Sequence, residues 1–176
     1  MGIQHKAILV KELAFADLHG RIGDKTSFAP PYPLHKLDEK AQYTANWCQR
    51  NLRTLPFNAG ERPFYEMRKT LLELIFTLPS DAIIYVKGTE KCKFLNDQLA
   101  YFYYCVKPKI CEMETELKTP SLLTLRRKFS SVYNWTKCDL HNDNCAFGNV
   151  FLLKQWYINE IILKNENLYI SQNPLL

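Results

Sequence analysis

The sequence predicts a single α/β domain, because strand-like and helix-like segments alternate along it and one strand leads through a tight turn into a helix. That unit consists of an apolar strand over 82–86, a turn at Gly88 and a helix over 90–99. The clearest helix covers 64–76, where apolar residues recur at helical intervals. The 176 residues of the chain suit one domain of this class.

The other elements are predicted from periodicity, turn residues and capping residues. The first half of the chain is expected to contain a strand over 7–16 that is interrupted by Lys11 and Glu12, a strand near 25–29 and a helix over 38–53. The second half is expected to contain strands over 101–106 and 110–114 and two further helices. The first of these helices has Thr119 as its N-cap and Pro120 as its first residue, and the last helix is capped by Asn142 or Asp143. We expect the domain to occupy 1–164 and the segment 165–176 to form a loose C-terminal tail.

The composition is that of an ordinary globular protein, with 47% hydrophobic and 23% charged residues. The longest apolar runs are much shorter than a bilayer span, and the apolar stretch near the N-terminus is too short for a signal peptide. Without an export signal, the six cysteines are expected to be reduced thiols or metal ligands, so we expect an intracellular protein of the cytoplasm or nucleus. The formal charge of +5 is too small to indicate nucleic-acid binding by itself.

Cys138, His141 and Cys145 form a cluster of potential zinc ligands within eight residues. Zinc favours thiolate and imidazole ligands, and the i, i+4 spacing of His141 and Cys145 allows both to face one side of a helix start. A fourth ligand must then come from elsewhere in the chain or from water. The alternative is that cysteines are small buried hydrophobic residues. We favour that alternative for three others, Cys48, Cys105 and Cys111.

The turn over 87–91 is a second candidate, because α/β proteins often place functional groups at the end of a strand. Gly88 permits a sharp backbone turn there. The alternative is a solvated, charged turn without a function, and the turn alone favours that alternative.

These two segments together resemble the Maelstrom domain, a divergent branch of the DnaQ-like exonucleases within the ribonuclease H-like fold. That family has a Glu-Cys-His-Cys set that binds zinc. The resemblance implies that the zinc ligands here are Glu90, Cys138, His141 and Cys145. It also implies a ribonuclease H-like mixed sheet flanked by helices, and it covers roughly residues 7–160 in patches.

Three carboxylates of active exonuclease-like domains are missing from this chain. Such domains open with a strand bearing an Asp-x-Glu pair, whereas none of the six residues before Ala7 is acidic, so the first strand is absent or supplied in another way. Active relatives close with His-x4-Asp, but position 146 is Ala. Two-metal cleavage needs several carboxylates to hold two cations. We therefore expect no catalytic residues of the standard exonuclease mechanism.

The zinc site then has two interpretations. With four protein ligands, zinc would be structural and would contribute to folding. If Glu90 is not a ligand, zinc keeps an open position and Glu90 could act as a general base on bound water, which would make the chain a nuclease.

The resemblance implies RNA association and a place in small-RNA silencing such as the piRNA pathway, with metal-independent RNA cleavage in some members. Basic residues interleaved with aromatic ones could contact phosphates while the rings stack on bases. The candidates for contact with single-stranded RNA are Lys87, Lys91, Lys93, Arg126, Arg127 and Lys128. The segments 62–68 and 107–109 have the same character. The alternatives are solvated basic residues, a protein partner, and a scaffold protein derived from a mobile element or a virus.

Overall fold

The computed structural model describes residues 9–19, 23–53, 55–100, 108–136 and 145–164. Within these ranges the chain forms small sheets and several helices, so the predicted mixed α/β class is confirmed. The predicted strand over 101–106 and the predicted tail over 165–176 lie outside the described residues.

The strands form two groups. The first group is an antiparallel hairpin of β1 (Glu12–Ala16) and β2 (Gly23–Ala29), to which the short β3 (Arg62–Pro63) adds in parallel on the far side of β2. The second group is the parallel pair of β4 (Ile83–Val86) and β5 (Lys109–Glu112). The strands predicted near 25–29 and over 82–86 are confirmed.

The helices lie mostly where the periodicity predicts them. Those of the described residues are α1 (Glu39–Cys48), α2 (Met67–Phe76), α3 (Thr89–Ala100), α4 (Met113–Glu116), α5 (Leu122–Lys128), α6 (Ser130–Thr136) and α7 (Ala146–Tyr157). Short 3-10 turns at Leu34–Lys36 and Phe64–Glu66 precede α1 and α2, and π-helical turns over Gln49–Arg53 and Ile158–Ile162 extend α1 and α7. The helices predicted over 38–53, 64–76 and 90–99 are confirmed.

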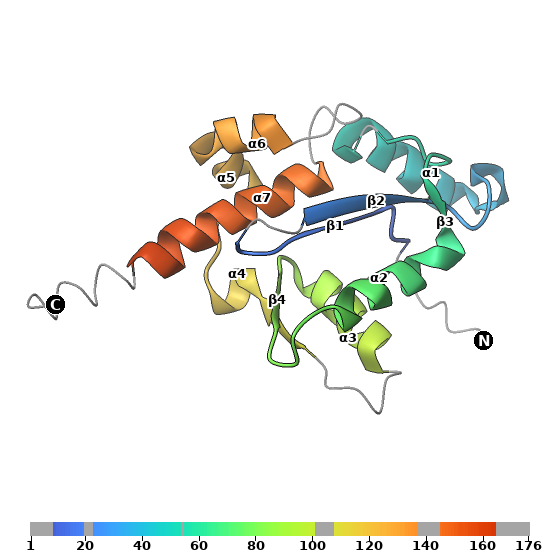
Figure 1. Cartoon of the computed structure of the whole chain (residues 1–176). Helices are drawn as coiled ribbons and strands as arrows, with labels where there is room; N and C mark the ends of the chain where they lie inside the picture. The colour runs from blue at the N-terminus through green and yellow to red at the C-terminus, as the bar shows by residue number, and fades with distance from the viewer. Residues whose placement is uncertain (1–8, 20–22, 54, 101–107, 137–144, 165–176) are drawn as a thin grey trace, which may run out of the picture.

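The helices cover both sides of the strands. Figure 1 shows α5, α6 and α7 on one side of the β1–β2 hairpin and α2, α3 and α4 on the other side. A hydrophobic cluster fills each side. The cluster under α2 and α3 contains Leu71, Ile75 and Leu99, with Leu13, Ile84, Phe94, Leu95 and Ile110 packed against it. The cluster under α7 contains Met113, Leu125, Tyr133, Leu152 and Trp156.

Strand β4 contributes to both clusters. Ile84 packs against the cluster under α2 and α3, whereas its neighbour Tyr85 packs against the cluster under α7. This alternation is the side-chain pattern of a strand covered on both faces. The hydroxyls of Tyr85 and Tyr157 are 2.7 Å apart and link β4 to α7. The strands therefore lie between two helical layers.

The first strand is shorter than predicted, because β1 begins at Glu12. The ammonium group of Lys11 donates hydrogen bonds to the carbonyl oxygens of Phe28 (2.9 Å), Phe57 (2.8 Å) and Ala59. It thereby connects the start of the hairpin to the loop that leads into β3 and α2. Lys11 therefore has a structural role, because it holds the loop that precedes α2. This role explains why a charged residue interrupts the predicted strand at position 11.

The start of α5 corrects a sequence prediction. Thr119 does not cap this helix, because its buried hydroxyl donates to the carbonyl oxygen of Met113 (2.9 Å). Ser121 is the N-cap, and its side chain accepts from the Thr124 N–H (3.1 Å). Lys118, just before Thr119, has a φ of 57°, so the chain turns sharply there and delays the helix.

The start of α7 also differs from the prediction. Its N-cap is Cys145, which makes no side-chain capping hydrogen bond. The predicted caps Asn142 and Asp143 lie outside the described residues.

Candidate nucleic-acid interface

The predicted zinc ligands occupy different environments. Cys138 and His141 lie outside the described residues. Cys145 is 1% exposed, and its backbone N–H donates to the hydroxyl of Tyr133 (3.2 Å). Glu90 is exposed in the first turn of α3.

The described structure does not bring Glu90 to Cys145. Helix α3 packs against β5, whereas α7 packs against the β1–β2 hairpin, α5 and α6. In Figure 1 α3 and the beginning of α7 lie on opposite sides of the hairpin. Among the residues that the structure describes, no three Cys, His, Asp or Glu side chains form a group that could hold a metal ion. The four-residue zinc site stays a prediction.

The turn after β4 is closed by internal partners. Gly88, at a φ of 111°, donates its N–H to the carboxylate of Glu112 (2.7 Å), and the Thr115 N–H donates to the same carboxylate (2.7 Å). Burial opposes ionisation of this group, but the hydrogen bonds from Gly88 and Thr115 prevail and lower the pKa of Glu112 to about 2. An internal carboxylate therefore occupies the place in front of α3 that a bound anion would take.

Lys87 belongs to the same network. Its side chain is 10% exposed, donates to the carbonyl oxygen of Thr119 (3.2 Å) and pairs with Glu114 (3.3 Å). These contacts join the end of β4 to the segment between α4 and α5. The geometry gives Lys87 a structural role.

The remaining predicted RNA contacts divide into two groups. Lys91 and Lys93 on α3 and Arg127 on α5 are exposed. Arg126 is half-buried, with its guanidinium 5.2 Å from the ring centre of Tyr133. Lys128 pairs with Glu160 (2.7 Å) and lies 5.3 Å from the ring centre of Phe129. The rings that these two cations contact are not exposed, since Tyr133 is buried and Phe129 is half-buried.

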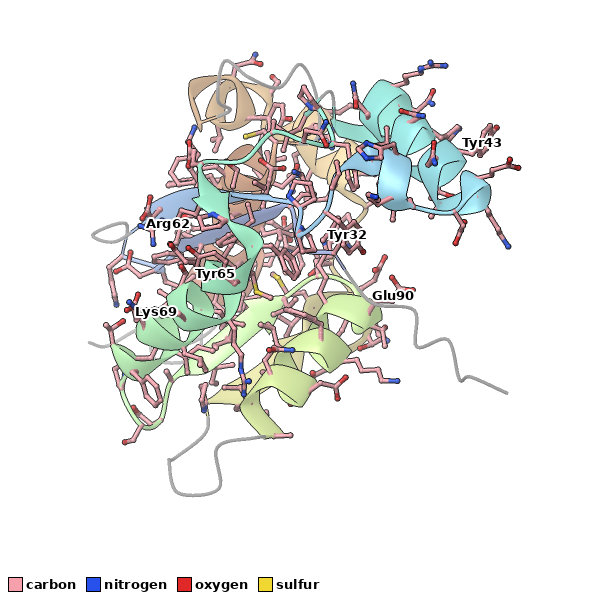
Figure 2. The ribbon with its side chains drawn as sticks, turned by 90° about the vertical axis from the view of Figure 1, so that its right-hand side faces the viewer. Tyr32, Tyr43, Arg62, Tyr65, Lys69 and Glu90 are labelled. Atoms are coloured by element: carbon pink, nitrogen blue, oxygen red, sulfur yellow. The ribbon has the colours of Figure 1, made fainter. Side chains whose placement is uncertain are left out.

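Exposed aromatic side chains gather in another part of the chain. In the described ranges, the exposed aromatic residues are Tyr32, Tyr43, Trp47, Tyr65 and Phe76. All five come from the segment 32–76, which contains α1 and α2. Figure 2 shows Tyr65 near Arg62 and Lys69, with Tyr32 and Tyr43 further along the same side of the molecule. This side combines the two residue types that a single-stranded nucleic acid needs.

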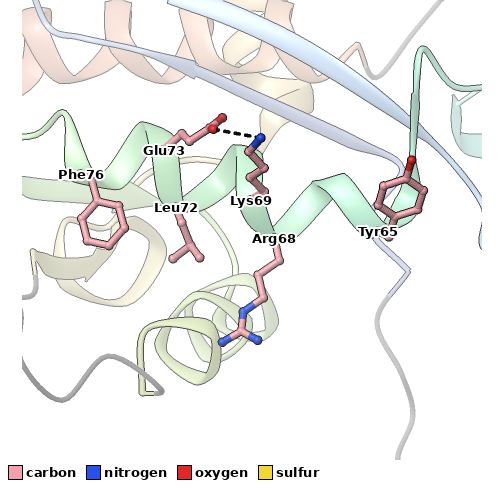
Figure 3. Close-up of a pocket in the computed structure, with 6 residues that line it drawn as sticks. All are labelled: Tyr65, Arg68, Lys69, Leu72, Glu73 and Phe76. Atoms are coloured by element: carbon pink, nitrogen blue, oxygen red, sulfur yellow. Dashed lines mark ion pairs between the residues drawn. The ribbon is translucent and has the colours of Figure 1, made fainter.

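The outer surface of α2 is the most concentrated part of this side. Two neighbouring rows of side chains, each spaced by four residues, line a shallow hollow of about 490 Å³. The first row is Tyr65, Lys69 and Glu73, and the second row is Arg68, Leu72 and Phe76. We call these six residues the α2 face. Figure 3 shows the second row on one side of the helix and the Lys69–Glu73 ion pair on the other side.

The two ends of the α2 face differ in charge. Tyr65 at the start is 80% exposed and precedes Arg68 and Lys69 by three and four residues, so this end of the α2 face carries two cations. Phe76 at the end is 56% exposed and lies three residues after Glu73. The sequence contained a signal for this surface, since Leu72 and Phe76 are apolar yet lie off the buried row of Met67, Leu71 and Ile75.

In the part of the chain that the structure describes, no helix is both long enough and apolar enough to cross a membrane. In comparisons with known proteins, no family model, curated protein or solved structure matched this chain.

Proposed function

We propose that this chain is a zinc-stabilised, catalytically degenerate module of ribonuclease H-like fold that binds single-stranded RNA, with a role in small-RNA silencing. The single observation behind RNA binding is the α2 face, where two exposed aromatic rings and two cations line one hollow. Strands between two helical layers and the strand–turn–helix unit at β4 support the fold part of the proposal.

The α2 face suits a single strand better than a duplex. Stacking of a base on an exposed ring is worth roughly 1–3 kcal/mol, and it requires a base that is not stacked inside a duplex. Tyr65 and Phe76 offer such rings at the two ends of the hollow. Arg68 and Lys69 lie where they can contact the phosphates between stacked bases.

The zinc part of the proposal is supported by the start of α7. Cys145 is buried there, and Cys138 and His141 precede it closely in the chain. A zinc ion held by these three residues and a fourth protein ligand would fasten the segment before α7 to the core under it. Such a site is structural, so its binding free energy contributes to folding.

Metal analysis tests the zinc part. We expect one zinc ion per chain in protein purified without chelator, and we expect Cys138→Ser to lose both the zinc and part of the thermal stability. Cys48→Ser is the matched control, because Cys48 lies on α1, outside the predicted ligand set, and should retain both. A protein that folds without stoichiometric zinc would contradict this part and leave RNA binding to be judged separately.

Two matched variants test RNA binding by the α2 face. Arg68→Gln removes an exposed cation from the α2 face, and Arg127→Gln removes an exposed cation from α5, which the sequence predicts as a contact. Fluorescence anisotropy with a labelled single-stranded RNA should show weaker binding for the first variant and nearly unchanged binding for the second. The reverse order would place the interface on α5, and absence of RNA binding by the wild type would contradict the proposal as a whole.

A further inference from the structure

We infer that the α2 face discriminates between bases, and that the carboxylate of Glu73 makes it bind cytosine in preference to uracil. This inference rests on the proposed function and deepens it. Its basis is that the hollow contains one carboxylate among six lining residues, at the end where the ring of Phe76 is exposed.

The carboxylate of Glu73 is available to a ligand. Its ion pair with Lys69 has an N–O distance of 3.7 Å, and the side chains of Lys69 and Glu73 are 75% and 60% exposed. An exposed pair of this kind on a helix is worth only a few tenths of a kcal/mol. A hydrogen bond from a ligand can therefore replace it at little cost.

The position of Glu73 directs it toward a base and not toward a phosphate. A carboxylate repels the phosphates, so the RNA backbone is expected near Arg68 and Lys69, at the Tyr65 end of the hollow. Glu73 and Phe76 lie at the same end of the hollow, so rotation of the Glu73 side chain away from Lys69 would bring its carboxylate toward the edge of a base stacked on Phe76. In this arrangement the Tyr65 end of the α2 face binds phosphates and the Phe76 end binds a base.

A carboxylate at this place distinguishes the two pyrimidines by their hydrogen-bonding groups. Ionised Glu73 is an acceptor only, and cytosine presents an amino group that donates to it. Uracil has a carbonyl oxygen at the same position, and its ring N–H stands between two carbonyl oxygens that the carboxylate repels. The two bases have rings of equal size, so stacking on Phe76 contributes similarly to both.

The test compares oligo(C) and oligo(U) RNAs of equal length near neutral pH, using the wild type, Glu73→Gln and Glu39→Gln. We expect the wild type to bind oligo(C) roughly fivefold more tightly than oligo(U), as one net hydrogen bond implies. Glu73→Gln should bring this ratio close to one, because an amide both accepts and donates. Glu39→Gln makes the same charge change in the first turn of α1 and should keep the wild-type ratio.

The outcomes separate the two proposals. If the wild type binds both RNAs equally, or if Glu73→Gln keeps the preference, the base discrimination is wrong although RNA binding stands. If Arg68→Gln leaves binding unchanged, the RNA lies elsewhere and both the α2 face and the role of Glu73 are wrong.

Discussion

At the scale of single residues, two charged groups that are partly or fully buried have specific backbone partners. The ammonium group of Lys11 donates to three backbone carbonyls, and the carboxylate of Glu112 accepts from two backbone N–H groups. Such groups are costly to leave without partners in an interior. Lys11 and Glu112 therefore fix two turns, the loop before α2 and the turn before α3.

Glu112 should make stability depend on pH. Its folded pKa is about 2, below the ordinary value of 4.5, so its contribution is present above pH 4.5 and is lost as the pH falls from 4.5 toward 2. We expect Glu112→Gln to lower the free energy of unfolding at pH 7 by on the order of 2 kcal/mol.

Urea unfolding at several pH values measures this effect. The difference in stability between wild type and Glu112→Gln should shrink as the pH falls from 4.5 toward 2, because the wild-type carboxyl then becomes protonated as well. A difference that stays constant over that range would show that the ionised form of Glu112 is not what stabilises the fold.

At the scale of elements, the loop over 57–60 packs closely against the end of β2. A Cβ atom on Gly60 would lie 1.9 Å from the backbone nitrogen of Ala29 and 2.2 Å from the carbonyl carbon of Phe28. These are backbone atoms, so relief requires movement of the loop or of β2.

Gly60→Ala should therefore destabilise the protein by roughly 1–3 kcal/mol, as overpacking of a close contact does. Gly23→Ala on β2 is the matched control, because its Cβ would meet no atom closer than 3.5 Å. Thermal unfolding of both variants measures the difference. Equal melting temperatures for the two variants would contradict the close approach of this loop.

Elements with local signals could be predicted from the sequence, and elements that depend on distant contacts could not. Helix α2 was predictable because Met67, Leu71 and Ile75 form one buried row. The start of α5 was not, because the hydroxyl of Thr119 donates to Met113 instead of capping the helix. The pairing of β4 with β5 joins strands separated by a whole helix, and no local pattern specifies its register.

The candidate site was predictable only in part, for the same reason. The sequence identifies Lys87 as a basic residue at a strand end, but only the fold shows that Glu114 and the carbonyl of Thr119 bind it. Conversely, Leu72 and Phe76 are visible in the sequence as apolar residues off the buried row of α2. That they line one hollow with Arg68 and Lys69 follows from the packing of the whole helix.

At the scale of the whole molecule, the net charge of +5 is modest, so the position of the cations matters more than their number. Several cations predicted to contact RNA have internal partners, as Lys87 and Lys128 do. The exposed aromatic rings of the described residues lie in the segment 32–76. The side of the molecule with α1 and α2 is therefore the one that we assign to the RNA, and the layer of α5, α6 and α7 is assigned to the core and the proposed zinc site.

The affinity of wild type, Arg68→Gln and Arg127→Gln for one single-stranded RNA, measured at several salt concentrations, tests RNA binding by the α2 face most directly. We expect Arg68→Gln to weaken binding at least about fivefold at low salt and to reduce the slope of log K against log salt by about 0.7, the value for one phosphate contact on a single strand. Arg127→Gln should stay within about twofold of the wild type with the same slope. An unchanged affinity and slope for Arg68→Gln, or a larger loss for Arg127→Gln, would contradict RNA binding by the α2 face.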